Sequence, residues 1–118
     1  MDELRTRRVA ETMREELSEL IRFESSDPRL VDVEVTDVIL SSDARRADVL
    51  VRVPEDPKLR LKALEGLEQA SSYLRHQLAQ RVELFRAPDL RFVADSQMPG
   101  GQNLSRLRRR LRRGRPKE

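Results

Sequence analysis

The sequence predicts one α+β domain in which helices cover one face of a three-stranded sheet. Three observations support this fold class. Leucine-rich stripes with helical spacing run through residues 3–24 and 57–82. Apolar and polar residues alternate in 31–40 and 47–53, and a short polar connector joins these two segments, as in a hairpin. A third short apolar segment follows the turn at Pro88, and 118 residues suffice for one domain and a short tail.

The first helix is expected over about residues 3–24. Its apolar residues share one side at i, i+3 and i+4 spacing, and this stripe comprises Val9, Met13, Leu17, Leu20 and Ile21. The helix should end before Pro28, because a residue that precedes proline disfavours helical geometry. The segment SSDPRL is therefore predicted to be a turn.

A hairpin should follow this turn. The apolar alternation in VDVEVTDVIL changes phase at Thr36-Asp37, which predicts a bulge or a twist there. SSDARR at 41–46 is the polar connector. The next strand, ADVLVRV, places four residues on one side: Ala47, Val49, Val51 and Val53.

A second helix begins after Asp56, which can cap it, with Pro57 at the first helical position. Its stripe comprises Leu64, Leu67, Ser71, Leu74 and Leu78. Ser71 thus occupies an apolar position, and Ser72 follows it. Two interpretations remain open, namely one long helix with a small polar gap or two helices that meet at a kink.

The last part of the chain predicts a third strand, a linker and a tail. RAPDLRFVAD is read as the strand, and SQMPGGQN resembles a linker. Residues 1–96 would then form the folded domain. Residues 97–118 would form a linker and an Arg-rich tail, with leucines at helical spacing. We expect this tail to be disordered or only nascently helical when unbound, because its arginines repel one another.

The charge is distributed unevenly along the chain. Residues 106–118 contain eight Lys/Arg and one acid, whereas residues 1–105 contain sixteen Lys/Arg and twenty Asp/Glu. The tail is therefore basic and the body mildly acidic. Of the 24 basic residues 21 are arginines, a bias that suits RNA recognition. A GC-rich genome, in which Arg codons are common, explains the same bias.

Several function classes find no support in the sequence. The chain has no cysteine, and His76 is its one histidine, so a zinc site or a catalytic base is not expected. We predict that His76 lies on a helix surface and that the acids are solvated. No enzyme activity, metal or cofactor is expected. Neither a secretory signal nor a membrane-spanning stretch is present, and a cytoplasmic location is the simplest expectation.

The four aromatic residues are too few for an RNA-stacking sheet: Phe23, Tyr73, Phe85 and Phe92. Phe23 and Phe92 are predicted to lie in the core. Tyr73 could stack on a base or pack against the protein, and packing is the favoured alternative.

The linked segments resemble those of the ribosome-binding factor A family over about residues 4–96. They are RTRRVAETMREELSELI, DPRL, VEVTDVILSSDARRADVLVRV with Ser41 and Asp43, and ASSYLRHQLAQRVELFRAPDLRFVAD. The resemblance implies a type II KH-like domain with the order α-β-β-α-kink-α-β. It also implies a helix–kink–helix at Ala70–Ser72, where Ser72 stands in place of the family's usual glycine.

The family's function, carried over as an expectation, is assembly of ribosomes. The chain would bind the maturing small (30S) subunit and 16S rRNA as a monomer, and it would promote late maturation and 5′-end processing of that rRNA. The residues expected to contact RNA are Arg5, Arg7, Arg8, Arg45, Arg46, Ser71, Ser72, Arg75, Arg106, Arg108, Arg109 and Arg110.

Alternatives to this interpretation remain. The arginines at the helix start and in the connector could simply be solvated. Arg75 could form an ion pair with Glu68 or another helix acid. At the level of the whole chain, a general RNA- or DNA-binding module without ribosome specificity is the chief rival. A protein adaptor that uses the acidic body is the second.

Overall fold

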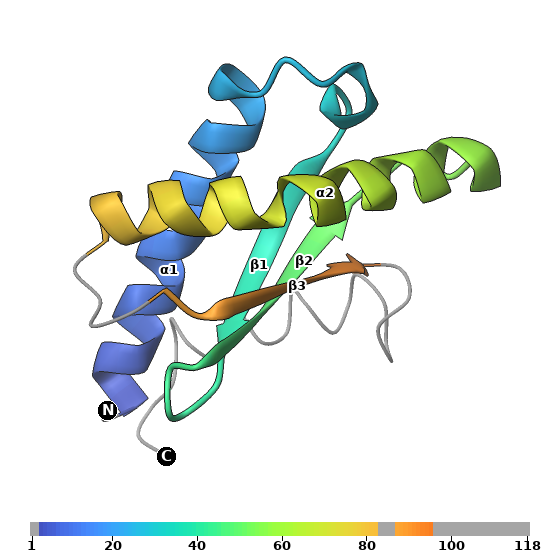
Figure 1. Ribbon diagram of the computed structural model, residues 1–118. Coiled ribbons are helices and arrows are strands. Elements are labelled where there is room, and N and C mark those ends of the chain that lie inside the picture. The colour runs from blue at the N-terminus through green and yellow to red at the C-terminus, as the bar shows by residue number, and fades with distance from the viewer. Residues whose placement is uncertain (1–2, 83–86, 96–118) are drawn as a thin grey trace.

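The computed structural model describes residues 3–82 and 87–95 (Figure 1). The elements are α1 (Glu3–Glu19), the π-helical turn η1 (Leu20–Glu24), the 3-10 turn η2 (Pro28–Leu30), β1 (Glu34–Leu40), β2 (Arg46–Arg52), α2 (Pro57–Arg81) and β3 (Asp89–Ala94). The predicted helices, strands and turn are all present. Their ends differ from the predicted ends by a few residues.

The three strands form one mixed sheet in the order β1-β2-β3. The β1–β2 pair is antiparallel, and the β2–β3 pair is parallel. A parallel pair requires a crossover connection, and α2 lies in that connection. Helices α1 and α2 cover the same face of the sheet (Figure 1). This is the predicted α+β class, and it is a KH-like arrangement.

The predicted stripes form the core. Leu17 of α1, Leu67 of α2 and Val49 of β2 are each 0% exposed and belong to one apolar cluster. Phe92 is partly buried against this cluster. The prediction for Phe23 was wrong, because its side chain is 73% exposed.

The exposure of Phe23 follows from the end of the first helix. Ile21 completes the buried stripe, and Phe23 lies two residues later on the π-helical turn, directed away from the core. The Arg22 guanidinium carbon lies 5.8 Å from the Phe23 ring centroid. This distance allows a cation–π contact, which accommodates an exposed ring.

The predicted bulge is present in β1. Val35 pairs with Val51, but the next paired residue of β1 is Asp37, opposite Leu50, which leaves Thr36 as the extra residue. The Thr36 hydroxyl donates a hydrogen bond to the Leu50 carbonyl over 3.1 Å. The bulge keeps the apolar residues on both sides of it turned toward the helices.

Helix α2 is a single helix of 25 residues, which begins as predicted. The Asp56 carboxylate accepts a hydrogen bond from the Leu59 N–H over 3.1 Å. Ser71 and Ser72 lie inside the helix, so the expected division into two helices is not found. Leucines on both sides of the serine pair are buried, and their packing outweighs the modest helix propensity of two serines.

Candidate nucleic-acid interface

The connection between β1 and β2 is organised by one serine and one aspartate. The Asp43 carboxylate accepts hydrogen bonds from the Ser41 hydroxyl over 2.7 Å and from the Arg45 N–H over 3.0 Å. These bonds lower the pKa of Asp43. The Ser41 hydroxyl also accepts from the Arg46 N–H over 3.0 Å. The backbone that carries the exposed side chains of Arg45 and Arg46 is therefore held in place.

Ala44 gives this connection its shape. Its φ of 61° lies in the left-handed region, where a residue with a Cβ is disfavoured. The Ala44 N–H donates to the Ser41 carbonyl over 2.9 Å, and the residue packs partly buried against the core. These contacts offset the conformational cost and turn the chain into β2.

Arg75 of α2 contacts the segment that leads into β3. Its Nε donates to the Pro88 carbonyl over 3.1 Å, and its Nη2 lies 3.3 Å from Asp89 Oδ1. The alternative pairing with Glu68 or another helix acid was therefore wrong. Arg75 is 37% exposed in its side chain, and its contact with RNA stays a prediction.

Asp89 brings the candidate arginines of α2 and β2 together. It lies opposite Arg46 in the parallel register, and its N–H donates to the Arg45 carbonyl over 2.9 Å. It also pairs with Arg75. Two arginines from the hairpin and one from α2 thus meet at one end of the sheet, although 29 positions separate Arg46 from Arg75 in the sequence.

The candidate arginines of α1 lie at this same end. Figure 1 shows the start of α1 beside the end of the molecule that carries the β1–β2 connection. Arg5 and Arg8 are exposed, and Arg7 is half-buried. A helix N-terminus carries partial positive charge, so these cations strengthen a positive end. We refer to Arg5, Arg7, Arg8, Arg45, Arg46 and Arg75 together as the basic end.

The later part of α1 and its π-helical turn are acidic, and they bind an arginine that sequence reasoning missed. Arg81, the last residue of α2, forms ion pairs with Glu16 at 3.3 Å, with Glu19 at 3.9 Å and with Glu24. Hydrogen bonds to Glu24 and then Glu16 raise the pKa of Arg81. Arg81 therefore joins the two helices, and three carboxylates surround its guanidinium.

The serine pair presents a small exposed surface on α2. Ser71 is half-buried and Ser72 is exposed. Tyr73 is 48% exposed, so packing does not account for its whole ring. His76 lies on the helix surface, as predicted, with its Nε2 atom 3.3 Å from Gln80 Nε2. Tyr73 is thus accessible to a base beside the serines.

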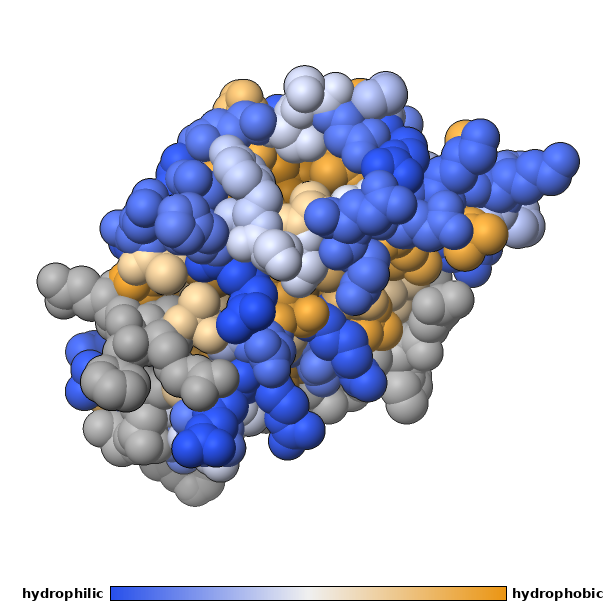
Figure 2. Space-filling view, in the orientation of Figure 1, coloured by the Kyte–Doolittle hydropathy of each residue, from blue (hydrophilic) through white to orange (hydrophobic). Residues whose placement is uncertain are grey.

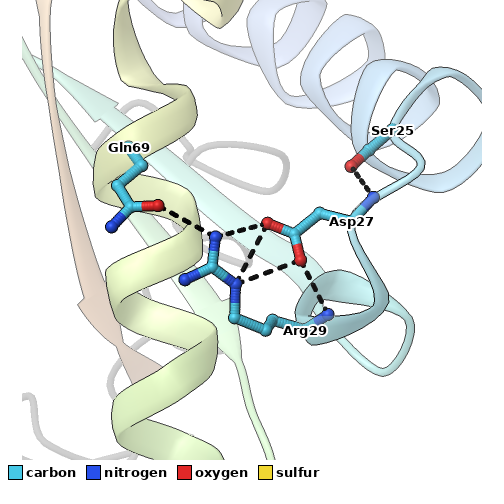
Figure 3. A network of polar contacts seen from close by, with 4 residues as sticks. All are labelled: Ser25, Asp27, Arg29 and Gln69. Atoms are coloured by element: carbon cyan, nitrogen blue, oxygen red, sulfur yellow. Dashed lines mark hydrogen bonds and ion pairs between the residues drawn. The ribbon is translucent and has the colours of Figure 1, made fainter.

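A second network, far from the basic end, was also missed (Figure 3). Asp27 accepts from the Arg29 N–H over 2.9 Å and pairs with its guanidinium, and these bonds lower the pKa of Asp27. The Arg29 Nη2 donates to Gln69 Oε1 of α2 over 2.9 Å. A Cβ on Gly66 would lie 3.2 Å from Leu30 Cδ2 and 3.3 Å from Arg29 Nε. Glycine in the helix therefore permits this close approach, and DPRL followed by a helical glycine was the available signal.

Other kinds of site are not found within residues 3–82 and 87–95. No group of three or more metal-ligating side chains occurs there, and none of the described helices is long and apolar enough to cross a membrane. Figure 2 shows a mainly hydrophilic surface, with hydrophobic atoms at the end where α2 begins; Leu59 and Leu61 are exposed there. The tail arginines at 106, 108, 109 and 110 lie outside the described residues.

A KH-like domain with arginines gathered at one end of its sheet defines a class of small nucleic-acid-binding proteins. The family model described as "Ribosome-binding factor A" matches residues 5–108. The chain belongs to the ribosome-binding factor A family.

Relatives of this family match the sequence over nearly the whole chain. A ribosome-binding factor A of Solibacter usitatus is 43% identical over 118 residues, which cover 100% of this chain and 96% of that protein. One of Moorella thermoacetica is 40% identical over 112 residues, which cover 93% of this chain and 92% of that protein.

Solved structures share the fold. The crystal structure of ribosome-binding factor A from Thermus thermophilus has a TM-score of 0.67 and 30% identity, and the match covers 75% of this chain and 94% of that one. A homology model of the Thermus thermophilus protein, fitted into a cryo-EM map of a 30S–RbfA complex, has a TM-score of 0.61 and 32% identity. That match covers 75% of this chain and 93% of the other.

Proposed function

We propose that this chain binds the maturing small (30S) ribosomal subunit through its 16S rRNA, as a monomer, and promotes late maturation and 5′-end processing of that rRNA without catalysing a reaction. The observation that carries the proposal is the basic end, where arginines from α1, the β1–β2 connection and α2 lie together. Family membership supports the same partner, because a relative from Thermus thermophilus was fitted into the map of a 30S complex.

Recognition would depend mainly on the rRNA backbone. Arginine binds phosphate oxygens through two parallel hydrogen bonds, and a fixed connection holds the Arg45 and Arg46 backbone in place before RNA arrives. Tyr73 offers one accessible ring for a base. Such contacts read shape and charge rather than a long base sequence.

The mechanism is occupancy. A protein that binds one rRNA arrangement better than another shifts the rRNA toward that arrangement, by no more than the difference in binding free energy. Nucleases that trim the 5′ end would then act on the favoured arrangement. The protein leaves when the mature rRNA no longer presents the site.

Sucrose-gradient fractionation tests the partner. We expect the wild-type protein to migrate with free small subunits and not with translating ribosomes. Arg45→Ser with Arg46→Ser should abolish this comigration, whereas Arg52→Ser with Arg60→Ser, which removes equal charge elsewhere, should preserve it. Migration of the wild-type protein with neither particle would refute the proposal.

The processing role has its own test. Cells that lack the protein should accumulate 16S precursors with unprocessed 5′ ends, measured by primer extension. The wild-type gene should restore mature ends, and the gene with both Arg45→Ser and Arg46→Ser should not. Normal 5′ ends in the deleted strain would remove processing from the proposed function.

The rival, a general RNA- or DNA-binding module, predicts equal affinity for purified small subunits and for random RNA at physiological salt. A protein adaptor predicts complexes that survive RNase treatment. We expect tighter binding to small subunits and loss of the complexes after RNase.

A further inference from the structure

The sheet has a second face, which turns away from α1 and α2. Val49 and Val51 belong to the core on the helix-covered face, and Leu50 between them points to the opposite side. In the strand register, Leu50 lies opposite Val93 of β3. Within the described ranges, 3–82 and 87–95, both long helices pack on the other face (Figure 1).

The centre of this second face is apolar except for Asp37, which lies opposite Leu50 in the strand register and is 1% exposed. Ile39, Leu50 and Val93 supply the apolar side chains, flanked by the Asp48–Arg91 ion pair at 3.2 Å. A hollow of about 350 Å³ is lined by Ile39, Asp48, Arg91 and neighbouring residues, among them Arg46 of the basic end.

The burial of Leu50 indicates that another part of the chain or a partner shields this face from water. A leucine at the centre of a bare three-stranded sheet would keep much of its side chain in contact with water, because one face of such a sheet is solvated. Leu50 is nevertheless 0% exposed, and Val93 is half-buried.

The residues that follow β3 are long enough to reach this face, and their sequence has an apolar stripe that could pack on it. The described chain ends at Asp95, directly after β3, and 23 residues follow it. The eight residues 96–103 can span at most about 26–29 Å, which exceeds the width of a three-stranded sheet of about 10 Å. The next segment carries leucines at helical spacing, namely Leu104, Leu107 and Leu111.

We propose that residues 104–111 dock their leucine stripe on the second face of the sheet, over Leu50 and Val93. In a helix, Arg106, Arg109 and Arg113 lie on the side opposite the leucines. Docking therefore turns these arginines outward. The carboxylates of Asp48 and Asp89, which pair with Arg91 and Arg75, line the hollow. Part of the basic tail becomes an ordered ridge beside the basic end. This proposal concerns the isolated chain and does not depend on ribosome binding. For residues 104–111 it replaces the expectation that the unbound tail is disordered.

Methyl NMR of the full-length protein tests the docking. We expect Leu104→Ser, Leu107→Ser and Leu111→Ser together to shift the methyl resonances of Leu50 and Val93. The core methyls of Val49 and Leu78 should stay in place, which also shows that the fold is intact.

The matched control changes three arginines on the side opposite the leucine stripe, two within residues 104–111 and one two residues after them. Arg106→Ser, Arg109→Ser and Arg113→Ser together should shift the Leu50 and Val93 methyls several-fold less than the serine substitutions of the leucines do. Equal small shifts for both triple variants would overturn the proposal. Shifts of these methyls that vary with protein concentration would also overturn it, because they would assign the cover to a second copy of the chain.

Discussion

In two turns of this molecule, the β1–β2 connection and η2, an aspartate carboxylate accepts a hydrogen bond from the N–H of an arginine two residues later, but the two arginine side chains differ in their contacts. In the β1–β2 connection, Asp43 accepts from a serine hydroxyl and from the Arg45 N–H, and the arginine side chain stays exposed. At η2, Asp27 accepts from the Arg29 N–H as well, but it also binds the arginine side chain, which reaches Gln69 of α2. An arginine beside an ordered aspartate is therefore not by itself a binding residue. The partners of its guanidinium decide its role.

The largest expected effect comes from crowding the η2 turn. Gly66→Leu would place a side chain where a Cβ alone already lies 3.2 Å from Leu30. Overpacking of this kind costs about 1–3 kcal/mol, so we expect a lower urea midpoint. Leu61→Ala, at an exposed site on the same helix, is the control and should change stability little. An unchanged midpoint for Gly66→Leu would show that η2 does not need its close contact with α2.

The next prediction separates the two arginines. Arg29→Ala should lower the urea midpoint, because it removes the bonds to Asp27 and Gln69, and it should leave RNA affinity unchanged in the folded fraction. Arg45→Ala should leave the midpoint unchanged and weaken binding. If Arg45 neutralises one phosphate, the log–log salt slope should fall by about 0.7–0.9. Equal effects of both variants on RNA affinity would remove the distinction between the turns.

Acid should loosen both turns. The pKa values of Asp27 and Asp43 are lowered by their hydrogen bonds from the ordinary value of 3.8. A carboxyl whose pKa is lower in the folded state stabilises the fold above its unfolded pKa, and this contribution is lost as the pH falls through the folded pKa. The contribution of these two carboxylates to the urea midpoint should therefore be constant near neutrality and should be lost below about pH 4.

Two amide variants check this assignment. Asp27→Asn and Asp43→Asn should each reduce the fall in stability below about pH 4. Glu68→Gln replaces an exposed carboxylate of α2 and should leave the fall unchanged. An undiminished fall in both aspartate variants would assign the acid sensitivity to other carboxyls.

The smallest expected effect concerns Ala44. Ala44→Gly relieves a left-handed backbone at φ 61° but adds freedom to the unfolded chain and removes a methyl group that packs on the core. These terms oppose each other, so stability should change by less than about 1 kcal/mol. Small-subunit affinity should also stay constant. A large loss of affinity would show that the backbone at Ala44 positions Arg45 more strongly than the hydrogen bonds of Asp43 do.

Much of the fold could be predicted from the sequence because local periodicity determines it. The stripe that includes Met13 and Leu17 became buried, the phase change at Thr36 became a bulge, and Asp56 caps α2. Each of these features depends on neighbours within a few residues. The arginine bias suited RNA recognition but also a GC-rich genome, so the linked segments, and not the composition, indicated the family.

The roles of the arginines could not be predicted from local sequence patterns. Arg75 binds residues 87–89, which lead into and begin β3, 12 to 14 positions away, and Arg81 binds Glu16, 65 positions away. Local pattern also left α2 open between one helix and two, and packing on the core resolved it as one. The sequence by itself determined the elements and the family. Only the tertiary structure decided which charges stabilise the fold and which remain exposed at the basic end, because an ion pair depends on distance in space and not on distance along the chain.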